Sequence, residues 1–160
     1  MGQDRGSAEA QPPRAAGGTY VLLLEVPRAL TIPVGRLGPV EFAAGRYAYV
    51  GSALGGLAGR LGRHLRREKR RHWHIDYLLE RAGVVGVIVA QTGERLECEV
   101  ARALGERYEV VPRFGASDCR CPGHLFRGDD GLKAAVESIM RGLGLEPGLW
   151  ARQLPGRVSA

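Results

Sequence analysis

The sequence contains no long hydrophobic run, few cysteines and no internal repeat. Its longest apolar stretches, VLLL at residues 21–24 and VVGVIVA at residues 84–90, have the length of strands and are too short to span a membrane. Residues 1–16 are polar and broken by prolines, so they lack the apolar segment of a signal peptide. We therefore expect a soluble cytoplasmic protein that contacts no membrane, with a disordered leader at residues 1–16.

Cysteine occurs only three times, which is too few, and odd in number, for a disulfide framework. This indicates reduced thiols in a reducing compartment. Cys119, Cys121 and His124 form a C-x-C-x2-H pattern, and Cys98 lies upstream. One interpretation is a zinc site of three cysteines and one histidine. The other is a set of partly buried thiols beside a histidine that bonds to a loop backbone, since C-x-C is not the usual zinc-knuckle spacing.

Positive charge is abundant and unevenly distributed. The net charge is +6, and the segment from Arg60 to Arg71 contains seven Arg or Lys residues and one acid, Glu68. Such a run is ordinarily a solvated helix face. Here it follows directly on two tyrosine-bearing strands, which favours the footprint of a nucleic acid. The residues expected to contact phosphates are Arg63, Arg66, Arg67, Lys69, Arg70 and Arg71.

Hydrophobic periodicity predicts strands alternating with helices. We expect long strands at residues 18–26 and 45–51, short ones at 30–34 and 39–42, and a buried strand at 84–90. Helices are expected after Gly51, within 72–79, within 94–107 and within 129–144, and an edge strand within 108–115. A length of 160 residues, 44% of them hydrophobic, suits one domain. We place this α/β domain at residues 17–127, a packing helix at 128–144 and a tail at 145–160.

Two triplets, Gly-Thr-Tyr ending at Tyr20 and Tyr-Val-Gly beginning at Tyr49, precede Arg60 and His64. This ordered series resembles the GIY-YIG nuclease superfamily, and within it the small stand-alone branch of Uri-type endonucleases, from about residue 18 to about residue 126. The resemblance implies a small sandwich whose central three-stranded, mainly antiparallel sheet is flanked by helices. It also implies a metal-dependent endonuclease that hydrolyses phosphodiester bonds in DNA.

In that superfamily a tyrosine acts as general base and an arginine neutralises the phosphate. The resemblance assigns these roles to Tyr49, our preferred base, and to Arg60, whose guanidinium suits a bidentate phosphate contact. Tyr20 would orient the water or the phosphate, and His64 would accept a proton or orient a tyrosine hydroxyl, unless it is a surface histidine near DNA. A free phenol has a pKa near 10, so the base needs a strong positive field, which Arg60, His64 and the metal would supply.

The resemblance also requires a carboxylate that holds a divalent metal. The expected third helix offers Glu94, Glu97 and Glu99, and Glu97 lies closest to the edge of its buried face. Glu99 lies further round, where a solvated salt bridge is the ordinary role. A single carboxylate suits Mg2+ or Mn2+, which keep several waters. Glu97 is therefore the predicted metal ligand.

Several residues near the motifs stay open. His72 and His74 are two positions apart, so a helix does not place them on one face. Asp76 caps the helix within 72–79, pairs with the basic run or joins the site. Tyr47 shares a strand face with Tyr49, and Gly51 is expected to permit close backbone approach. Two other functions remain: a nucleic-acid-binding module without catalysis, and a zinc-stabilised domain that recruits a partner. The sequence does not separate DNA from RNA or name a protein that delivers the nuclease to its substrate.

Overall fold

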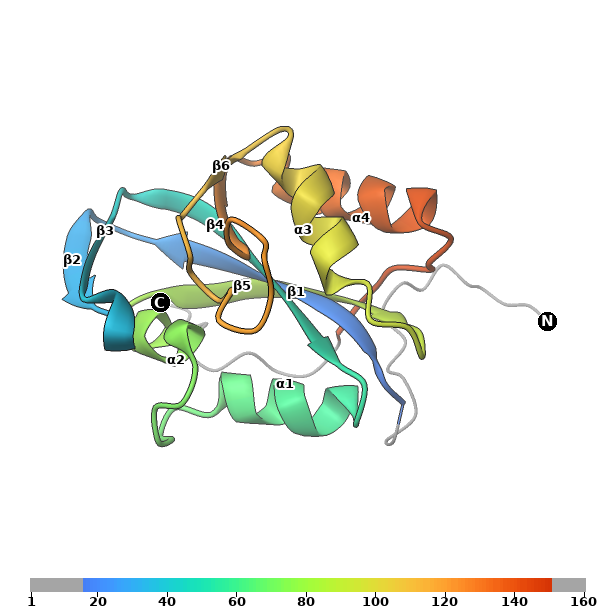
Figure 1. The fold of residues 1–160 in the computed structure, drawn as a ribbon, viewed down its shortest axis with the longest axis horizontal. Helices are drawn as coiled ribbons and strands as arrows, with labels where there is room; N and C mark the ends of the chain where they lie inside the picture. The colour runs from blue at the N-terminus through green and yellow to red at the C-terminus, as the bar shows by residue number, and fades with distance from the viewer. Residues whose placement is uncertain (1–15, 151–160) are drawn as a thin grey trace.

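A computed structural model describes residues 16–150 of the chain, so the predicted leader lies outside it except for residue 16, as do the last ten residues of the predicted tail. The described part is a mixed α/β fold in which one antiparallel sheet lies between two layers of helices (Figure 1). This confirms the α/β class expected from the sequence. None of the helices within residues 16–150 is long and apolar enough to cross a membrane.

The central strand, β1 (Gly18–Val26), is buried along almost its whole length. It pairs on one side with β4 (Gly45–Ala53) and on the other with β5 (Gly83–Gln91), both antiparallel. Its residues alternate between two cores, with Tyr20 and Leu22 on one face and Val21 and Leu23 on the other. The apolar run of this strand therefore reflects helices on both faces of the sheet.

The sheet is larger than the sequence predicts. Its six strands follow the order β6-β7-β4-β1-β5-β8, so the expected three-stranded centre is extended on both sides. The added strands are β7 (Leu125–Gly128), β6 (Glu109–Val110) and β8 (Gly148–Leu149). Strand β6 is the edge strand predicted within residues 108–115, and it lies at the edge of the sheet. Strands β7 and β8 are four and two residues long, which is too short for a periodic signal, and their partners are distant in sequence. Because β8 pairs with β5, the segment from residue 145 is not wholly a tail.

A separate hairpin leaves the sheet between β1 and β4. Its strands, β2 (Leu30–Pro33) and β3 (Pro39–Phe42), lie at the two short stretches expected from the sequence. A short 3-10 helix, η1 (Gly35–Leu37), connects them. Ile32 and Phe42 pack this hairpin against the same core as Tyr20.

Each face of the sheet carries two helices (Figure 1). On the face of Tyr20 lie α1 (Leu57–Leu65) and α2 (His74–Leu79), which bury Leu57, Leu61 and Ile75. On the opposite face lie α3 (Glu97–Gly105) and α4 (Leu132–Gly142), the predicted packing helix, and α3 and α4 contribute Val100 and Val136 respectively to the second core.

The first and third helices are shorter than expected. Helix α1 ends at Leu65, so most of the basic run, from residue 66 onward, lies in the loop that precedes α2. Helix α3 begins at Glu97, which leaves Glu94 in the preceding turn. These boundaries place His64 in the last turn of α1 and Glu97 in the first turn of α3.

Candidate active site

Tyr20 and Tyr49 lie on the same face of neighbouring strands. In the register of β1 and β4, Tyr20 opposes Gly51 and Tyr49 opposes Leu22, so the two phenols are diagonal neighbours. A Cβ atom at Gly51 would collide with the ring and hydroxyl of Tyr20. Gly51 therefore makes room for the Tyr20 side chain and not for the close approach of backbone that its place at the end of the strand predicts.

His64 completes a pair with Tyr20. The Tyr20 hydroxyl and His64 Nε2 are 2.6 Å apart, and His64 is only 2% exposed. Burial lowers the pKa of His64 to about 3, so the imidazole is neutral at physiological pH. His64 Nδ1 has no hydrogen-bond partner among the residues described. This histidine is not the surface residue that the sequence left as an alternative.

The electrostatics of the two tyrosines differ from the expectation. Burial raises the pKa of Tyr20 to about 12, although the nearby Arg60 guanidinium opposes the shift. Burial also raises the pKa of Tyr49 well above its usual value, with smaller contributions from Tyr20 and Glu97. Of the expected positive groups, His64 is uncharged, and the charge of Arg60 lowers the two tyrosine pKa values by less than burial raises them. Both phenols are therefore protonated in the free protein.

Arg60 lies beside this pair on α1. One Nη donates to the Ser52 carbonyl oxygen at 2.8 Å, and the guanidinium carbon lies 4.7 Å from the centre of the Trp73 ring. The guanidinium is half-buried and is held by both contacts, so it is preorganised. The hydrogen bond to Ser52 uses one of its five N–H donors. The contribution of Ser52 could not be predicted from the sequence, because a backbone carbonyl leaves no signature there.

Glu97 lies on α3, in the helical layer on the other face of the sheet from α1. Its charge contributes to the raised pKa values of both Tyr20 and Tyr49. Its side chain is 20% exposed, with Arg95 Nη1 4.0 Å away. Glu94 and Glu99 are exposed. Of the three candidate acids, Glu97 is the one whose charge bears on both tyrosines.

Arg63, in contrast, is held by the protein itself. Its two Nη atoms donate to the Asp76 carboxylate at 3.0 and 2.9 Å, and one also donates to the Arg70 carbonyl oxygen. Asp76 is 1% exposed and also accepts from the backbone N–H groups of His72 and Trp73 at the start of α2. Burial alone would raise the pKa of Asp76, but these hydrogen bonds lower it. Asp76 thus caps α2 and ties it to α1.

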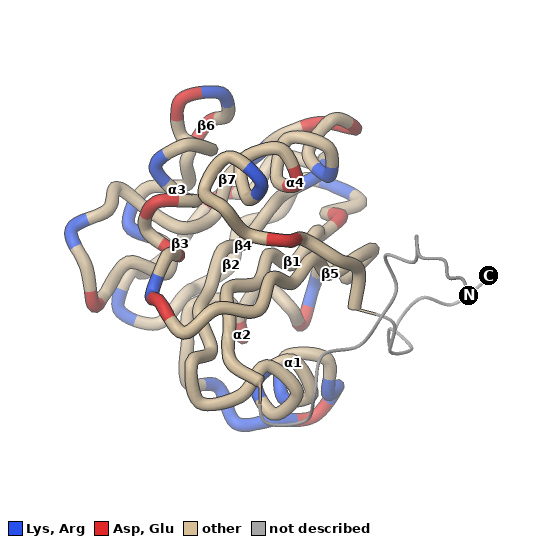
Figure 2. Tube along the Cα trace, turned by 90° about the vertical axis from the view of Figure 1, so that its right-hand side faces the viewer, with Lys and Arg blue, Asp and Glu red and all other residues tan. Residues whose placement is uncertain are grey.

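Two more cations of the basic run have protein partners. Lys69 Nζ donates to the carbonyl oxygens of His64 and Arg66 at the end of α1. Arg71 forms an exposed ion pair with Glu80 at 2.8 Å. The exposed cations of the run that remain are Arg66, Arg67 and Arg70. Figure 2 shows basic positions gathered around α1.

The four candidate zinc ligands lie together. One ligand atom from each of Cys98, Cys119, Cys121 and His124 lies within 4.8 Å of all the others. Cys98 comes from the first turn of α3, Cys119 and Cys121 from the loop between β6 and β7, and His124 directly precedes β7. Burial and the neighbouring thiols raise the pKa of Cys98 to about 12. The fold therefore assembles a cluster that could bind a metal, and its sulfur-rich ligand set is typical of zinc and not of magnesium or manganese.

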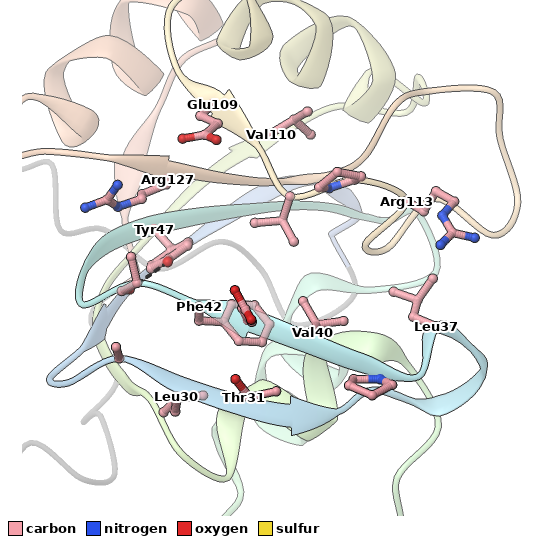
Figure 3. Close-up of a pocket in the computed structure, with 16 residues that line it drawn as sticks. Leu30, Thr31, Leu37, Val40, Phe42, Tyr47, Glu109, Val110, Arg113 and Arg127 are labelled. Carbon is pink, nitrogen blue, oxygen red and sulfur yellow. Dashed lines mark hydrogen bonds between the residues drawn. The ribbon is translucent and has the colours of Figure 1, made fainter.

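A wide pocket lies elsewhere, between the β2–β3 hairpin and the segment around β6 (Figure 3). Its volume is about 930 Å³, and Tyr47, Arg113 and Arg127 are among its lining residues. The Tyr47 hydroxyl donates to the Ala43 carbonyl oxygen at 2.7 Å. Tyr49, Arg60, His64 and Glu97 do not line this pocket, so the buried Tyr47 lies at the wall of a cavity separate from those four residues.

The fold and the site define a small α/β domain with a buried tyrosine–histidine pair and an adjacent cysteine–histidine cluster. The chain matches the family described as "Domain of unknown function DUF123" over residues 19–145, and it belongs to that family. No curated protein and no solved structure matches it. The matched region contains Tyr20, Arg60, Glu97 and every residue of the cluster.

Proposed function

We propose that this protein is a metal-dependent endonuclease that hydrolyses DNA phosphodiester bonds. The observation that carries the proposal is the 2.6 Å contact between the Tyr20 hydroxyl and His64 Nε2, beside Arg60 and within the electrostatic reach of Glu97. These four residues come from β1, α1 and α3. The resemblance of the ordered motifs to GIY-YIG nucleases supports the same reaction. The proposal includes a reducing cytoplasm, in keeping with three free thiols.

Hydrolysis requires a base that takes a proton from the attacking water. We assign this task to Tyr20 and His64 together, in preference to Tyr49, because Tyr20 has a proton acceptor in contact. The phenol oxygen accepts the proton of the water while its own proton passes to His64 Nε2, so the phenol stays neutral and the imidazole becomes charged. An anionic phosphate beside the pair raises the pKa of His64 and so favours this transfer.

Arg60 and Tyr49 then act on the phosphate. The guanidinium of Arg60 binds nonbridging oxygens and stabilises the charge of the transition state. The Tyr49 hydroxyl, which keeps its proton, donates a hydrogen bond to the same group. Proton transfer and charge stabilisation are thereby divided between the two tyrosines.

The reaction further needs help for the leaving oxygen. The partly exposed carboxylate of Glu97, whose charge raises the pKa of both tyrosines, is a hard oxygen donor of the type that binds Mg2+ or Mn2+. We assign the divalent metal to this carboxylate. When bound, such a cation supplies Lewis-acid stabilisation of the leaving oxygen.

Exposed arginines would guide the DNA to this centre. Arg66, Arg67 and Arg70 follow α1 directly, so a duplex held by them lies next to Arg60. Three arginines carry little sequence information, since phosphate contacts position a duplex without reading it. We therefore include in the proposal a DNA structure recognised by shape, or a repair or DNA-binding protein that delivers the nuclease.

The test is a cleavage screen with purified full-length protein and Mg2+ or Mn2+ on plasmid, single-stranded, flap and branched DNA, with matched RNA. We expect metal-dependent cleavage of at least one DNA that Glu97→Gln abolishes, because an amide is a poor ligand for a hard cation. Glu99→Gln, which alters an exposed acid on the same helix, is the control and should cleave normally. Absence of cleavage on all substrates, or equal activity of Glu97→Gln and wild type, would overturn the proposal.

A further inference from the structure

The cysteine–histidine cluster has the dimensions of a closed zinc site. Tetrahedral zinc holds sulfur at about 2.3 Å and nitrogen at about 2.0 Å, which sets the ligand atoms of a three-cysteine, one-histidine site about 3.5–3.8 Å apart. His124 Nε2 lies 3.3 Å from Cys119 Sγ and 4.0 Å from Cys98 Sγ, and all four ligand atoms fall within 4.8 Å of one another. Small side-chain rotations bring the four groups onto one ion.

His124 is also oriented as a metal ligand. Its Nδ1 lies 3.3 Å from the Val50 carbonyl oxygen, so the proton on Nδ1 is donated to the backbone and the lone pair of Nε2 faces the sulfurs. Metal-binding histidines commonly donate their other ring N–H in this way, which fixes the tautomer. The Val50 N–H in turn donates to the His124 carbonyl oxygen at 3.0 Å. The imidazole is thus held before any ion binds.

The loop that carries two of the cysteines has few other means of holding its shape. Residues 115–122 are exposed or half-buried and form neither helix nor strand. The apolar residue that anchors this region is Phe114, and Gly115 N donates to His74 Nδ1 at 2.8 Å. A cross-link to α3 through Cys98 would fix the rest of the loop.

We propose that Cys98, Cys119, Cys121 and His124 bind one structural Zn2+ ion, and that this ion sets the position of Glu97 relative to Tyr49. Four protein ligands close the coordination shell, as in structural zinc sites. Cys98 follows Glu97 in the first turn of α3, and His124 is hydrogen-bonded to Val50, the neighbour of Tyr49 on β4. The ion therefore joins the helix of the acid to the strand of the phenol. The first part of the proposal, the zinc site, does not depend on the proposed function. The importance of the second part, the positioning of Glu97, rests on the proposed nuclease function.

Metal content tests the first part without any nuclease assay. Full-length protein purified without chelator should contain one zinc per chain by elemental analysis, and cobalt substitution should give the absorption bands of a tetrahedral thiolate site. Cys121→Ser should lose the zinc, and Cys121→His, which restores a ligand, should recover it. His72→Ala, which changes an exposed histidine outside the cluster, should keep one zinc. Zinc-free wild type, or full zinc in Cys121→Ser, would overturn the site.

Hydrogen exchange tests the second part. Removing zinc from wild-type protein should speed amide exchange at residues 97–101 and 114–124 and leave α4 protected, because α4 contributes no ligand. Unchanged exchange at residues 97–101 would show that the ion does not hold Glu97. Because neither measurement uses cleavage, a protein that binds zinc but cuts no DNA would disprove the nuclease function and leave the zinc site intact.

Discussion

The ring of Tyr20 lies across Gly51, its antiparallel neighbour on β4, in the space that a Cβ atom would occupy. Gly51→Ala should therefore push the phenol away from His64 and destabilise the fold by about 1–3 kcal/mol, as expected for overpacking. Denaturant unfolding followed by circular dichroism measures the change. Gly62→Ala is the control, because a Cβ there meets nothing within 4 Å and alanine favours the helix. Equal stability of Gly51→Ala and wild type would contradict the close contact.

The hydrogen bond between Tyr20 and His64 predicts that the two tyrosines contribute unequally to cleavage. Tyr20→Phe should slow the reaction by about 10²-fold to 10⁴-fold, the range that general base catalysis supplies. Tyr49→Phe should slow it less, since it removes only a hydrogen-bond donor to the phosphate. Single-turnover rates at saturating Mg2+ compare the two variants. A larger loss in Tyr49→Phe would make Tyr49 the base, as the sequence alone suggests.

The buried Arg63–Asp76 pair predicts a large loss of stability when the carboxylate is removed. Asp76→Ala leaves the Arg63 guanidinium without its partner and the start of α2 uncapped, which should cost about 3–5 kcal/mol. Glu80→Ala breaks the exposed ion pair with Arg71 and should cost less than about 1 kcal/mol. Chemical denaturation of both variants checks the contrast. Similar losses of unfolding free energy in Asp76→Ala and Glu80→Ala would mean that the buried ion pair stabilises the fold no more than the exposed one.

The depressed pKa of His64 predicts a loss of stability in mild acid. The unfolded chain binds a proton at His64 near pH 6.5, whereas the folded protein resists it until about pH 3. This contribution is therefore fully present above pH 6.5 and is lost as the pH falls, by up to about 1.4 kcal/mol per pH unit. Between about pH 6 and 4.5, His64→Gln should show a flatter dependence of unfolding free energy on pH.

His72→Gln is the matched control for this measurement, because His72 is exposed. It should retain the wild-type slope. A slope in His64→Gln as steep as that of wild type would show that the imidazole is protonated as easily in the folded as in the unfolded protein.

The exposed arginines predict how DNA affinity depends on salt. If Arg60, Arg66, Arg67 and Arg70 each meet one phosphate, log affinity should fall with log salt at a slope of about −3.6, given about −0.9 per phosphate in duplex DNA. Replacing Arg66, Arg67 and Arg70 by Ala should flatten the slope to about −0.9, the contribution of Arg60. Arg71→Ala should change it little, because Glu80 already occupies that guanidinium. Fluorescence anisotropy at several salt concentrations provides the slopes, and an unchanged slope in the triple variant would assign these arginines to solvent.

Local patterns predicted much of the fold. Strands β1 and β4 and the apolar face of α1 were readable because each has a periodicity that depends on its own residues. Strands β7 and β8 were not predicted, because four and two residues become strands only through partners far along the chain. The enlarged sheet is therefore a property of tertiary pairing.

The candidate site divides in the same way. Motif order predicted that Tyr20 and His64 would lie close together, and helical spacing predicted that Glu97 would be the half-buried acid. The pKa directions could not be predicted, since burial dominates them and burial is set by the whole fold. The sequence offered capping, pairing with the basic run and a place in the site as roles of Asp76, and the structure shows the first two. The sequence could not identify Arg63 as the partner, because the path of the loop between the two helices is not set by local pattern.

The short strand β8 covers part of the outer edge of β5. Gly148 and Leu149 pair with Val89 and Ile88, and Trp150 N donates to the Val87 carbonyl oxygen. A fragment cut at residue 145, where the family match ends, would leave this row of backbone donors and acceptors without partners beside an apolar strand. Open edges of this kind recruit strands from other molecules. The eight described residues beyond the last helix, 143–150, contain no proposed catalytic group, yet they help to keep one copy of the protein from aggregating with the next.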